Sequence, residues 1–119
     1  MNPAIDLGQI EGGLAQGIGW MTMEELIYNE AGVLKSANLA NYKIPDIYSV
    51  PKEVAVRYLA TEGSELAILK SKAVGEPPLM YGIGAYFALC NAILAYNANA
   101  KLTYIAPMTT ERVLMSLYS

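Results

Sequence analysis

Glu76 is the residue whose setting most clearly suggests chemistry. It stands in the stretch SKAVGEPPL, residues 71–79, between Gly75 and the pair Pro77 and Pro78. Pro77 favours an extended conformation for the residue before it, and Gly75 permits a sharp turn ahead of it. Because proline is tolerated in a first helical turn, Glu76 is predicted at or near a helix N-cap. A carboxylate fixed in this way suits proton abstraction, although a purely structural acidic N-cap explains the same residues.

A second candidate is the glycine-rich stretch GQIEGGLAQGIGW, residues 8–20. On a helix, one face would carry Gln9, Gly12, Gly13, Gln16, Gly17 and Trp20. The glycines at 12, 13, 17 and 19 cost such a helix about 3–4 kcal/mol in propensity. That cost indicates that another backbone or a ligand approaches the face closely. The alternatives are a helix-packing seam, with both glutamines hydrogen-bonded internally, or a ligand-binding wall. The stretch lacks the third glycine and the preceding strand of a dinucleotide-binding fingerprint.

The composition excludes several kinds of site. The 119 residues include no histidine and a single cysteine, Cys90, so Ser-His and Cys-His catalysis, histidine-ligated metals, disulfides and iron–sulfur ligation within this chain are excluded. The net charge is −3 and no basic stripe is present, which argues against nucleic-acid partners. No signal peptide is recognisable at the N-terminus. A reducing, cytoplasmic compartment is expected.

The elements that would position these residues follow an α+β pattern in a single domain or part of one. A glycine-rich N-terminal helix is predicted from Asp6 to about Met23, and a long apolar helix over about 78–97. Thr109 is the predicted cap of a short C-terminal helix that ends at Leu117. Short strands are predicted at residues 25–28, 53–60 and 102–105, with turns at 29–32 and 61–65.

The apolar content indicates a large exposed surface. Hydrophobic residues make up 54% and charged residues 16% of the chain, whereas about 25% is usual for charged residues. Such a chain is expected to self-associate or to be a piece of something larger. Residues 79–96 form an uncharged run at the lower limit for a membrane span. Asn91 within it and acidic rather than basic residues before it favour a buried helix.

The two motifs, in this order and about sixty residues apart, resemble the C-terminal end of the molybdenum-binding subunit of the xanthine dehydrogenase and aldehyde oxidase family, the molybdenum hydroxylases. The stretches that carry the resemblance are NPAIDLGQIEGGLAQGIGW, EELIY, NYKIP and SKAVGEPPL, followed by the long apolar helix and a looser tail with APMTTERV. The resemblance implies a fragment of the C-terminal molybdopterin-binding domain.

Enzymes of this family hydroxylate a heterocycle or an aldehyde, with water as the source of oxygen. The resemblance implies that Glu76 is the general base and that Gln9 hydrogen-bonds near the pyranopterin. The other residues it implies for the cofactor site are Gly8, Gly12, Gly13, Gln16 and Gly75. The implied cofactor is a molybdenum–pyranopterin, either molybdopterin or its cytosine dinucleotide form, with no metal ligand from this chain. Iron–sulfur clusters and FAD are expected only on other domains or subunits.

The resemblance also implies partners. The family's molybdenum subunit is several times longer, so the rest of that subunit and the iron–sulfur and flavin partners are expected to complete the enzyme. The isolated chain is expected to be inactive. An excised domain, a separate subunit and a truncated gene product all fit this sequence. Two other kinds of protein stay open: a non-catalytic, self-associating α+β module that keeps family residues, and a small membrane-anchored protein.

Overall fold

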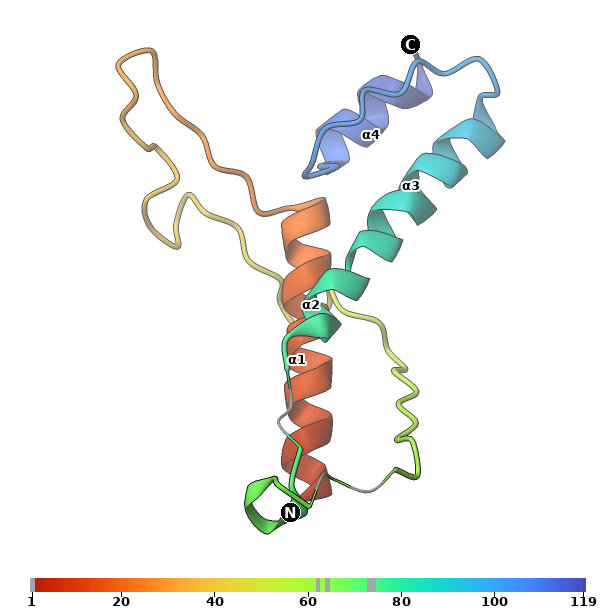
Figure 1. Ribbon diagram of the computed structural model, residues 1–119. Coiled ribbons are helices and arrows are strands. Elements are labelled where there is room, and N and C mark those ends of the chain that lie inside the picture. The colour runs from red at the N-terminus through yellow and green to blue at the C-terminus, as the bar shows by residue number, and fades with distance from the viewer. Residues whose placement is uncertain (1, 62, 64, 73–74) are drawn as a thin grey trace.

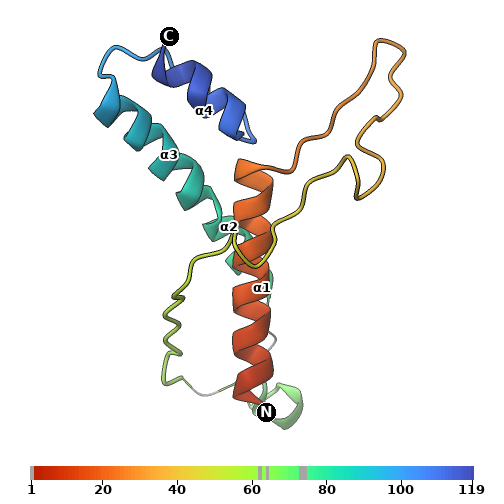
Figure 2. The same ribbon diagram turned by 180° about the vertical axis from the view of Figure 1, so that it is seen from behind.

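The computed structural model describes residues 2–61, 63, 65–72 and 75–119, and the regular secondary structure in these ranges is helical (Figure 1). The elements in chain order are α1 (Pro3–Thr22), the short 3₁₀ helix η1 (Ile68–Lys70), α2 (Pro77–Tyr81), α3 (Ile83–Tyr96) and α4 (Thr110–Leu117). In both views α2 crosses α1, and α3 leads away from this crossing to lie beside α4 (Figures 1 and 2). The site motifs therefore sit at the crossing.

The first helix begins three residues before its predicted start. Asn2 is its N-cap, and the Asn2 side chain accepts a hydrogen bond from the N–H of Ala4 at 3.1 Å. Pro3 occupies the first turn, where its missing N–H costs nothing. The helix ends at Thr22, close to the predicted boundary. The sequence signal for this start, an asparagine followed by proline, is a local one.

The predicted long helix is two helices that meet at Gly82. Gly82 is buried, and a Cβ built on it would lie 2.1 Å from the carbonyl carbon of Gly17. The backbones of α1 and α2 are therefore in direct contact at this point. The N–H of Gly82 donates to the carbonyl of Leu79 at 3.2 Å, a short-range bond that tightens the last turn of α2. The direction of the chain changes where α1 approaches most closely.

The small hydrophobic core lies between α3 and α4. Its buried members are Tyr86, Cys90, Ile93 and Met108. The prediction for α4 is confirmed, because the Thr109 side chain accepts a hydrogen bond from a backbone N–H in the first turn of the helix at 3.3 Å. The N–H of Met108 donates to the carbonyl of Met21 at 2.7 Å, which ties the start of α4 to the end of α1.

The predicted strands are not found among the residues that the structure describes. The segment after α1 makes one isolated antiparallel bridge, between Tyr28 and Leu34, around a turn in which Gly32 has a φ of 75°. Residues 53–60 and 102–105 form no ladder in the described part of the chain. A strand is stable only beside a partner strand, and the described residues offer these segments none. The α+β class is therefore not confirmed. The turn predicted at 61–65 lies partly outside the described residues.

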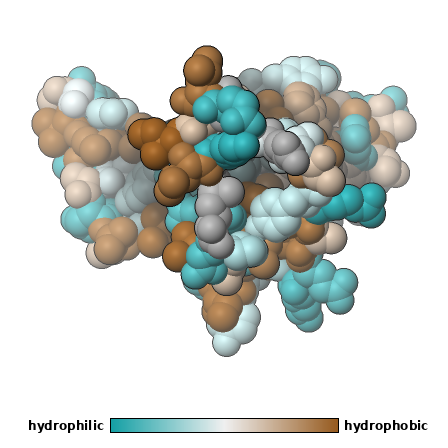
Figure 3. Space-filling model, turned by 60° about the horizontal axis from the view of Figure 1, so that its bottom comes forward, coloured by the Kyte–Doolittle hydropathy of each residue, from teal (hydrophilic) through white to brown (hydrophobic). Residues whose placement is uncertain are grey.

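The chain exposes far more surface than a compact domain of its size. Its radius of gyration is 18.3 Å, whereas about 13.5 Å is expected for 119 residues. Its accessible surface is 9345 Å², against about 6,300 Å² for a folded monomer of this mass. Figure 3 shows hydrophobic residues between hydrophilic ones over one face. Ile47, Tyr48 and Leu59 are among the most exposed apolar side chains. The apolar surface predicted from composition is present.

The segment Pro77–Tyr96 is long and apolar enough to cross a membrane, by length and composition alone. Core helices of soluble proteins meet the same criterion, so this is weak evidence for a span. One side of α3, with Tyr86, Cys90 and Ile93, is buried against the rest of the chain. Phe87 on the same helix is half-exposed. The burial predicted for this helix is thus only partial within the described residues.

Candidate functional site

One pocket, which we call the carboxylate pocket, contains all seven residues predicted for the site. It has a volume of about 480 Å³. Its lining residues are Gly8, Gln9, Gly12, Gly13, Gln16, Trp20, Gly75, Glu76, Pro78 and Leu79. Two sequence motifs about sixty residues apart therefore form one site, with one wall from α1 and the other from the start of α2. What these residues bind stays a prediction.

The seam between the two walls is built on Gly13 and Gly17. A Cβ on Gly13 would lie 3.1 Å from the Cβ of Pro78, and a Cβ on Gly17 would lie 2.0 Å from the carbonyl oxygen of Leu79. A methyl group at position 17 would overlap the backbone of α2. The helix-packing explanation therefore holds for this part of the glycine face.

Glu76 is the N-cap residue of α2, as predicted, but its carboxylate caps nothing. An N-cap side chain usually accepts from the N–H of the second or third helical residue. Pro78, the second residue, has no N–H, and the N–H of Leu79, the third, donates to the Glu76 backbone carbonyl at 2.9 Å. The two prolines and this one hydrogen bond leave the carboxylate without a backbone partner in the first turn of α2.

The predicted extended conformation of Glu76 is wrong. Its φ is −93° and its ψ is 8°, between the helical and extended regions. The hydrogen bond from Leu79 requires this conformation, because the Glu76 carbonyl must point along the helix to accept it. Gly75 leaves room at this point: a Cβ there would make a tight contact of 3.1 Å with Cδ of Pro77.

Among the described residues, Glu76 is the only charged one that lines the carboxylate pocket. Its side chain is exposed and makes no ion pair with any described residue. Lys72, four positions earlier, donates instead to the hydroxyl of Thr61 at 2.6 Å. The carboxylate is therefore available as a proton acceptor, without a cation or a donor from the described chain beside it.

Gln9 and Gln16 bring two amides to the α1 wall. They are seven residues apart and lie on one face, about 10 Å apart along the helix axis. Both are exposed, and neither side chain is hydrogen-bonded to another described residue. The internal hydrogen bonds of the seam explanation are thus not observed. Each amide offers a carbonyl acceptor and two N–H donors to a ligand.

Gly8 and Gly12 complete the α1 wall. A Cβ built on either residue meets no described atom within 4 Å, so the space beside both is open. Glycine at these two positions is not explained by packing within the described chain, unlike Gly17. It leaves the α1 backbone bare, so that a broad ligand can lie against it.

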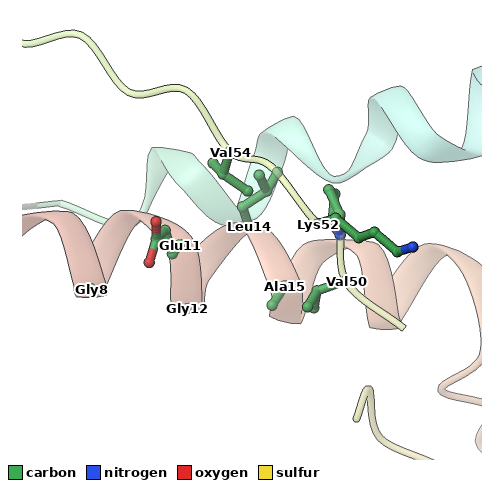
Figure 4. Close-up of a pocket in the computed structure, with 9 residues that line it drawn as sticks. Gly8, Glu11, Gly12, Leu14, Ala15, Val50, Lys52 and Val54 are labelled. Carbon is green, nitrogen blue, oxygen red and sulfur yellow. The ribbon is translucent and has the colours of Figure 1, made fainter. Parts of the chain in front are cut away.

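A second pocket of about 460 Å³ shares Gly8 and Gly12 and lies between α1 and residues 50–54. Figure 4 shows the segment with Lys52 and Val54 crossing over α1. The side chains of Glu11 and Lys52 lie toward opposite ends of this pocket. No ion pair joins these two side chains in the part of the chain that the structure describes. The sequence motifs did not predict this pocket, and its lining is mainly aliphatic and backbone.

Three lining residues of the carboxylate pocket were not predicted as site residues. Trp20 lies eleven positions after Gln9, and this spacing already placed it on the glutamine face. Pro78 and Leu79 belong to the second motif and line the pocket because α2 rests on α1. The helical spacing could have identified Trp20, whereas the other two depend on the crossing.

Comparisons with known proteins identify the family of this chain. The model of the molybdopterin cofactor-binding domain family matches residues 1–51, which include the α1 wall. Xanthine dehydrogenase of Drosophila pseudoobscura pseudoobscura is 43% identical over 98% of this chain, and xanthine dehydrogenase/oxidase of Felis catus is 46% identical over 95% of it. Quinoline 2-oxidoreductase from Pseudomonas putida 86 superimposes on 99% of the chain with a TM-score of 0.79 and 36% identity. The chain belongs to the molybdenum hydroxylase family.

This molybdenum hydroxylase segment is short beside its relatives. It spans 9% of the length of each of those two xanthine dehydrogenases and 14% of the quinoline 2-oxidoreductase chain. Membership of a molybdopterin cofactor-binding family makes a molybdenum–pyranopterin the relevant cofactor. The residues present fit such a group, because two amides without described partners stand beside a bare glycine backbone in an open pocket. Among the described residues, no cluster of side chains has the composition of a metal-binding site.

Proposed function

We propose that this segment is part of an oxidoreductase that hydroxylates a nitrogen heterocycle or an aldehyde, with water as the source of oxygen and Glu76 as the general base. One observation carries the proposal: the Glu76 carboxylate lies in the same pocket as Gln9 and Gln16, and no described residue caps it or pairs with it. A purely structural acidic N-cap would accept a hydrogen bond from a backbone N–H in the first turn of the helix through its carboxylate. A general base must keep its carboxylate free for the substrate side.

The proposed roles of the residues are those that the family resemblance implies, and their shared pocket supports them. Glu76 accepts the proton of the attacking water at a carboxylate oxygen. Gln9 and Gln16 hydrogen-bond the cofactor, and Gly8 and Gly12 let its broad face approach the helix. Gly13 and Gly75 line the same wall and the approach to Glu76. When bound, the molybdenum–pyranopterin supplies the redox centre for the two electrons of the oxidation.

The substrate class rests on the relatives. Two are named for xanthine and one for quinoline, and both compounds are nitrogen heterocycles. A purine or another nitrogen heterocycle is therefore our first choice, with an aldehyde as the alternative. The cofactor is either molybdopterin or its cytosine dinucleotide form, and the iron–sulfur clusters and FAD are on other domains or subunits. We place the enzyme in the cytoplasm.

The large exposed surface of this chain supports the proposal that other parts of the enzyme pack against it. About 3,000 Å² more surface is exposed than a compact monomer of this mass would show, several times the ~800 Å² per partner of a standard interface. We propose that the remainder of the molybdenum subunit covers this surface and closes the carboxylate pocket. The isolated chain would then be inactive, because its pocket is open and holds only part of the site.

The test is Glu76→Gln in the complete enzyme that carries this segment. The glutamine keeps the size of the side chain but cannot take the proton. General-base catalysis contributes about 10²–10⁴-fold, so we expect turnover per bound molybdenum to fall by that factor. Molybdenum content and the thermal midpoint should stay the same, because the carboxylate makes no capping bond. Near-normal turnover at full molybdenum occupancy would contradict the proposal.

A further inference from the structure

We infer that Gly17 and Gly82 are positioning residues that set where Glu76 stands relative to the α1 wall. The inference rests on the proposed role of Glu76 as the base. Neither glycine lines the carboxylate pocket. Their importance comes from the crossing of α1 and α2, where both are buried.

The crossing is a contact of backbone on backbone. A Cβ on Gly17 would lie 2.0 Å from the carbonyl oxygen of Leu79 and 3.1 Å from Cα of Gly82. Conversely, a Cβ on Gly82 would lie 2.1 Å from the carbonyl carbon and 2.5 Å from Cα of Gly17. Every one of these atoms belongs to the backbone, so no side-chain rotation can relieve the overlap. A methyl group at either position must push the two helices apart.

Leu79 connects this crossing to Glu76. Its carbonyl oxygen lies against Gly17, and its N–H donates to the Glu76 carbonyl at 2.9 Å. The two residues between them, Pro77 and Pro78, have φ angles fixed by their rings. The five-residue helix α2 therefore has little freedom to bend, and a displacement at Leu79 is passed on to Glu76.

The two walls of the pocket belong to different helices. Gln9 and Gln16 are on α1, whereas Glu76 is at the N-cap of α2. The distance between α1 and α2 at their crossing therefore sets the separation between the Glu76 carboxylate and the two glutamine amides. To bring a contact of 2.0 Å at least to a tolerable 3.0 Å, α2 must move by about 1 Å. A misplacement of about 1 Å can cost about 10²-fold in rate.

The experiment compares Gly17→Ala and Gly82→Ala in the complete enzyme, with Gly84→Ala as the matched control. A Cβ on Gly84 meets no described atom within 4 Å, and the residue is only two positions from Gly82. We expect kcat per bound molybdenum to fall about 10²-fold in the first two variants and to stay unchanged in the control. A crystal structure of either variant should show Glu76 farther from Gln9. Unchanged kcat and an unmoved carboxylate in both variants would overturn the inference.

A double-mutant cycle separates positioning from general damage. If Gly17 acts through Glu76, Gly17→Ala should cost nothing further in an enzyme that already carries Glu76→Gln. The same 10²-fold loss in that background would overturn the inference. If Gly17→Ala and Gly82→Ala do not fold, Gly13→Ala, whose Cβ would meet Pro78 at 3.1 Å, replaces them, and its crystal structure should show Glu76 farther from Gln9. If Glu76→Gln alone keeps full turnover, the proposed base is wrong, and the displacement of residue 76 in the crystal structure still decides the positioning.

Discussion

Glu76 accepts the first hydrogen bond of α2 from Leu79, at 2.9 Å, through its backbone carbonyl and not through its carboxylate. The proline pair between the two residues leaves Leu79 as the first residue of the turn with an N–H to donate. Pro77 and Pro78 lack N–H groups, and the N–H of Leu79 already has its partner. The two prolines and the hydrogen bond from Leu79 thus explain both why Glu76 stands at the N-cap and why its carboxylate has no partner in the first turn.

Pro78→Ala in the complete enzyme should give the Glu76 carboxylate a capping hydrogen bond. The substitution restores an N–H at the second helical position, where N-cap side chains commonly bind. If Glu76 is the proposed base, a capping bond of about 1 kcal/mol would lower kcat about 5-fold, because the carboxylate must give up that bond to react. Pro77→Ala is the matched control, since an N–H at the first position is not the usual cap partner. Equal kcat values for both variants and the parent would contradict this account.

The contact between Tyr42 and Glu24 should make the segment after α1 sensitive to high pH. The hydroxyl of Tyr42 donates to the Glu24 carboxylate, and this bond, with burial and the negative charge of Glu24, raises the pKa of Tyr42 above its usual value. The folded state therefore holds the phenolic proton more tightly than the unfolded state. The contribution to stability is complete below about pH 10 and is lost as pH rises through the folded-state pKa.

The measurement is a tyrosinate absorbance titration of the parent and of Tyr42→Phe. Their difference spectrum should have its midpoint above pH 10. Glu24→Gln, which removes the charge and keeps the size of the side chain, should bring that midpoint down. A difference spectrum with the same midpoint in the presence and absence of the Glu24 charge would show that the contact does not control Tyr42.

The 119-residue chain on its own should self-associate. Its exposed surface exceeds that of a compact monomer by about 3,000 Å², and half-exposed apolar side chains such as Phe87 contribute to it. We expect sedimentation at micromolar concentration to show a dimer or larger species. A monomer throughout that concentration range would refute the argument from surface area.

The local signals in the sequence predicted their elements well. Thr109 caps α4 as its position indicated, and α1 ends where its apolar pattern stops. The cost of the helical glycines predicted a close approach, and Gly17 has one. In each case the cause lies within a few residues or in a conformational preference of one residue type. The placement of both motifs in one pocket was implied by the family resemblance and not by spacing.

The remaining features depend on residues far away in the chain. The break at Gly82 follows from contact with Gly17, which no local pattern of the apolar run reveals. The segment at 53–60 has the alternation of a strand, but alternation cannot supply a partner strand, and no ladder forms in the described residues. The conformation of Glu76 follows from its hydrogen bond with Leu79, which overrides the preference that Pro77 imposes.

The crossing of α1 and α2 has a consequence for the order of folding. It joins Gly17 to Leu79 across about sixty residues, and closing such a loop costs roughly 3–4 kcal/mol in chain entropy. The contact of α3 with α4 spans about a dozen residues, from Asn97 to Thr109, and costs roughly 2 kcal/mol. The pair α3–α4 should therefore gain protection first in pulse-labelled hydrogen exchange, and simultaneous protection would contradict this order. The carboxylate pocket is then a late product of folding, and the cofactor that we propose for it should bind only to a chain whose long-range contacts have already formed.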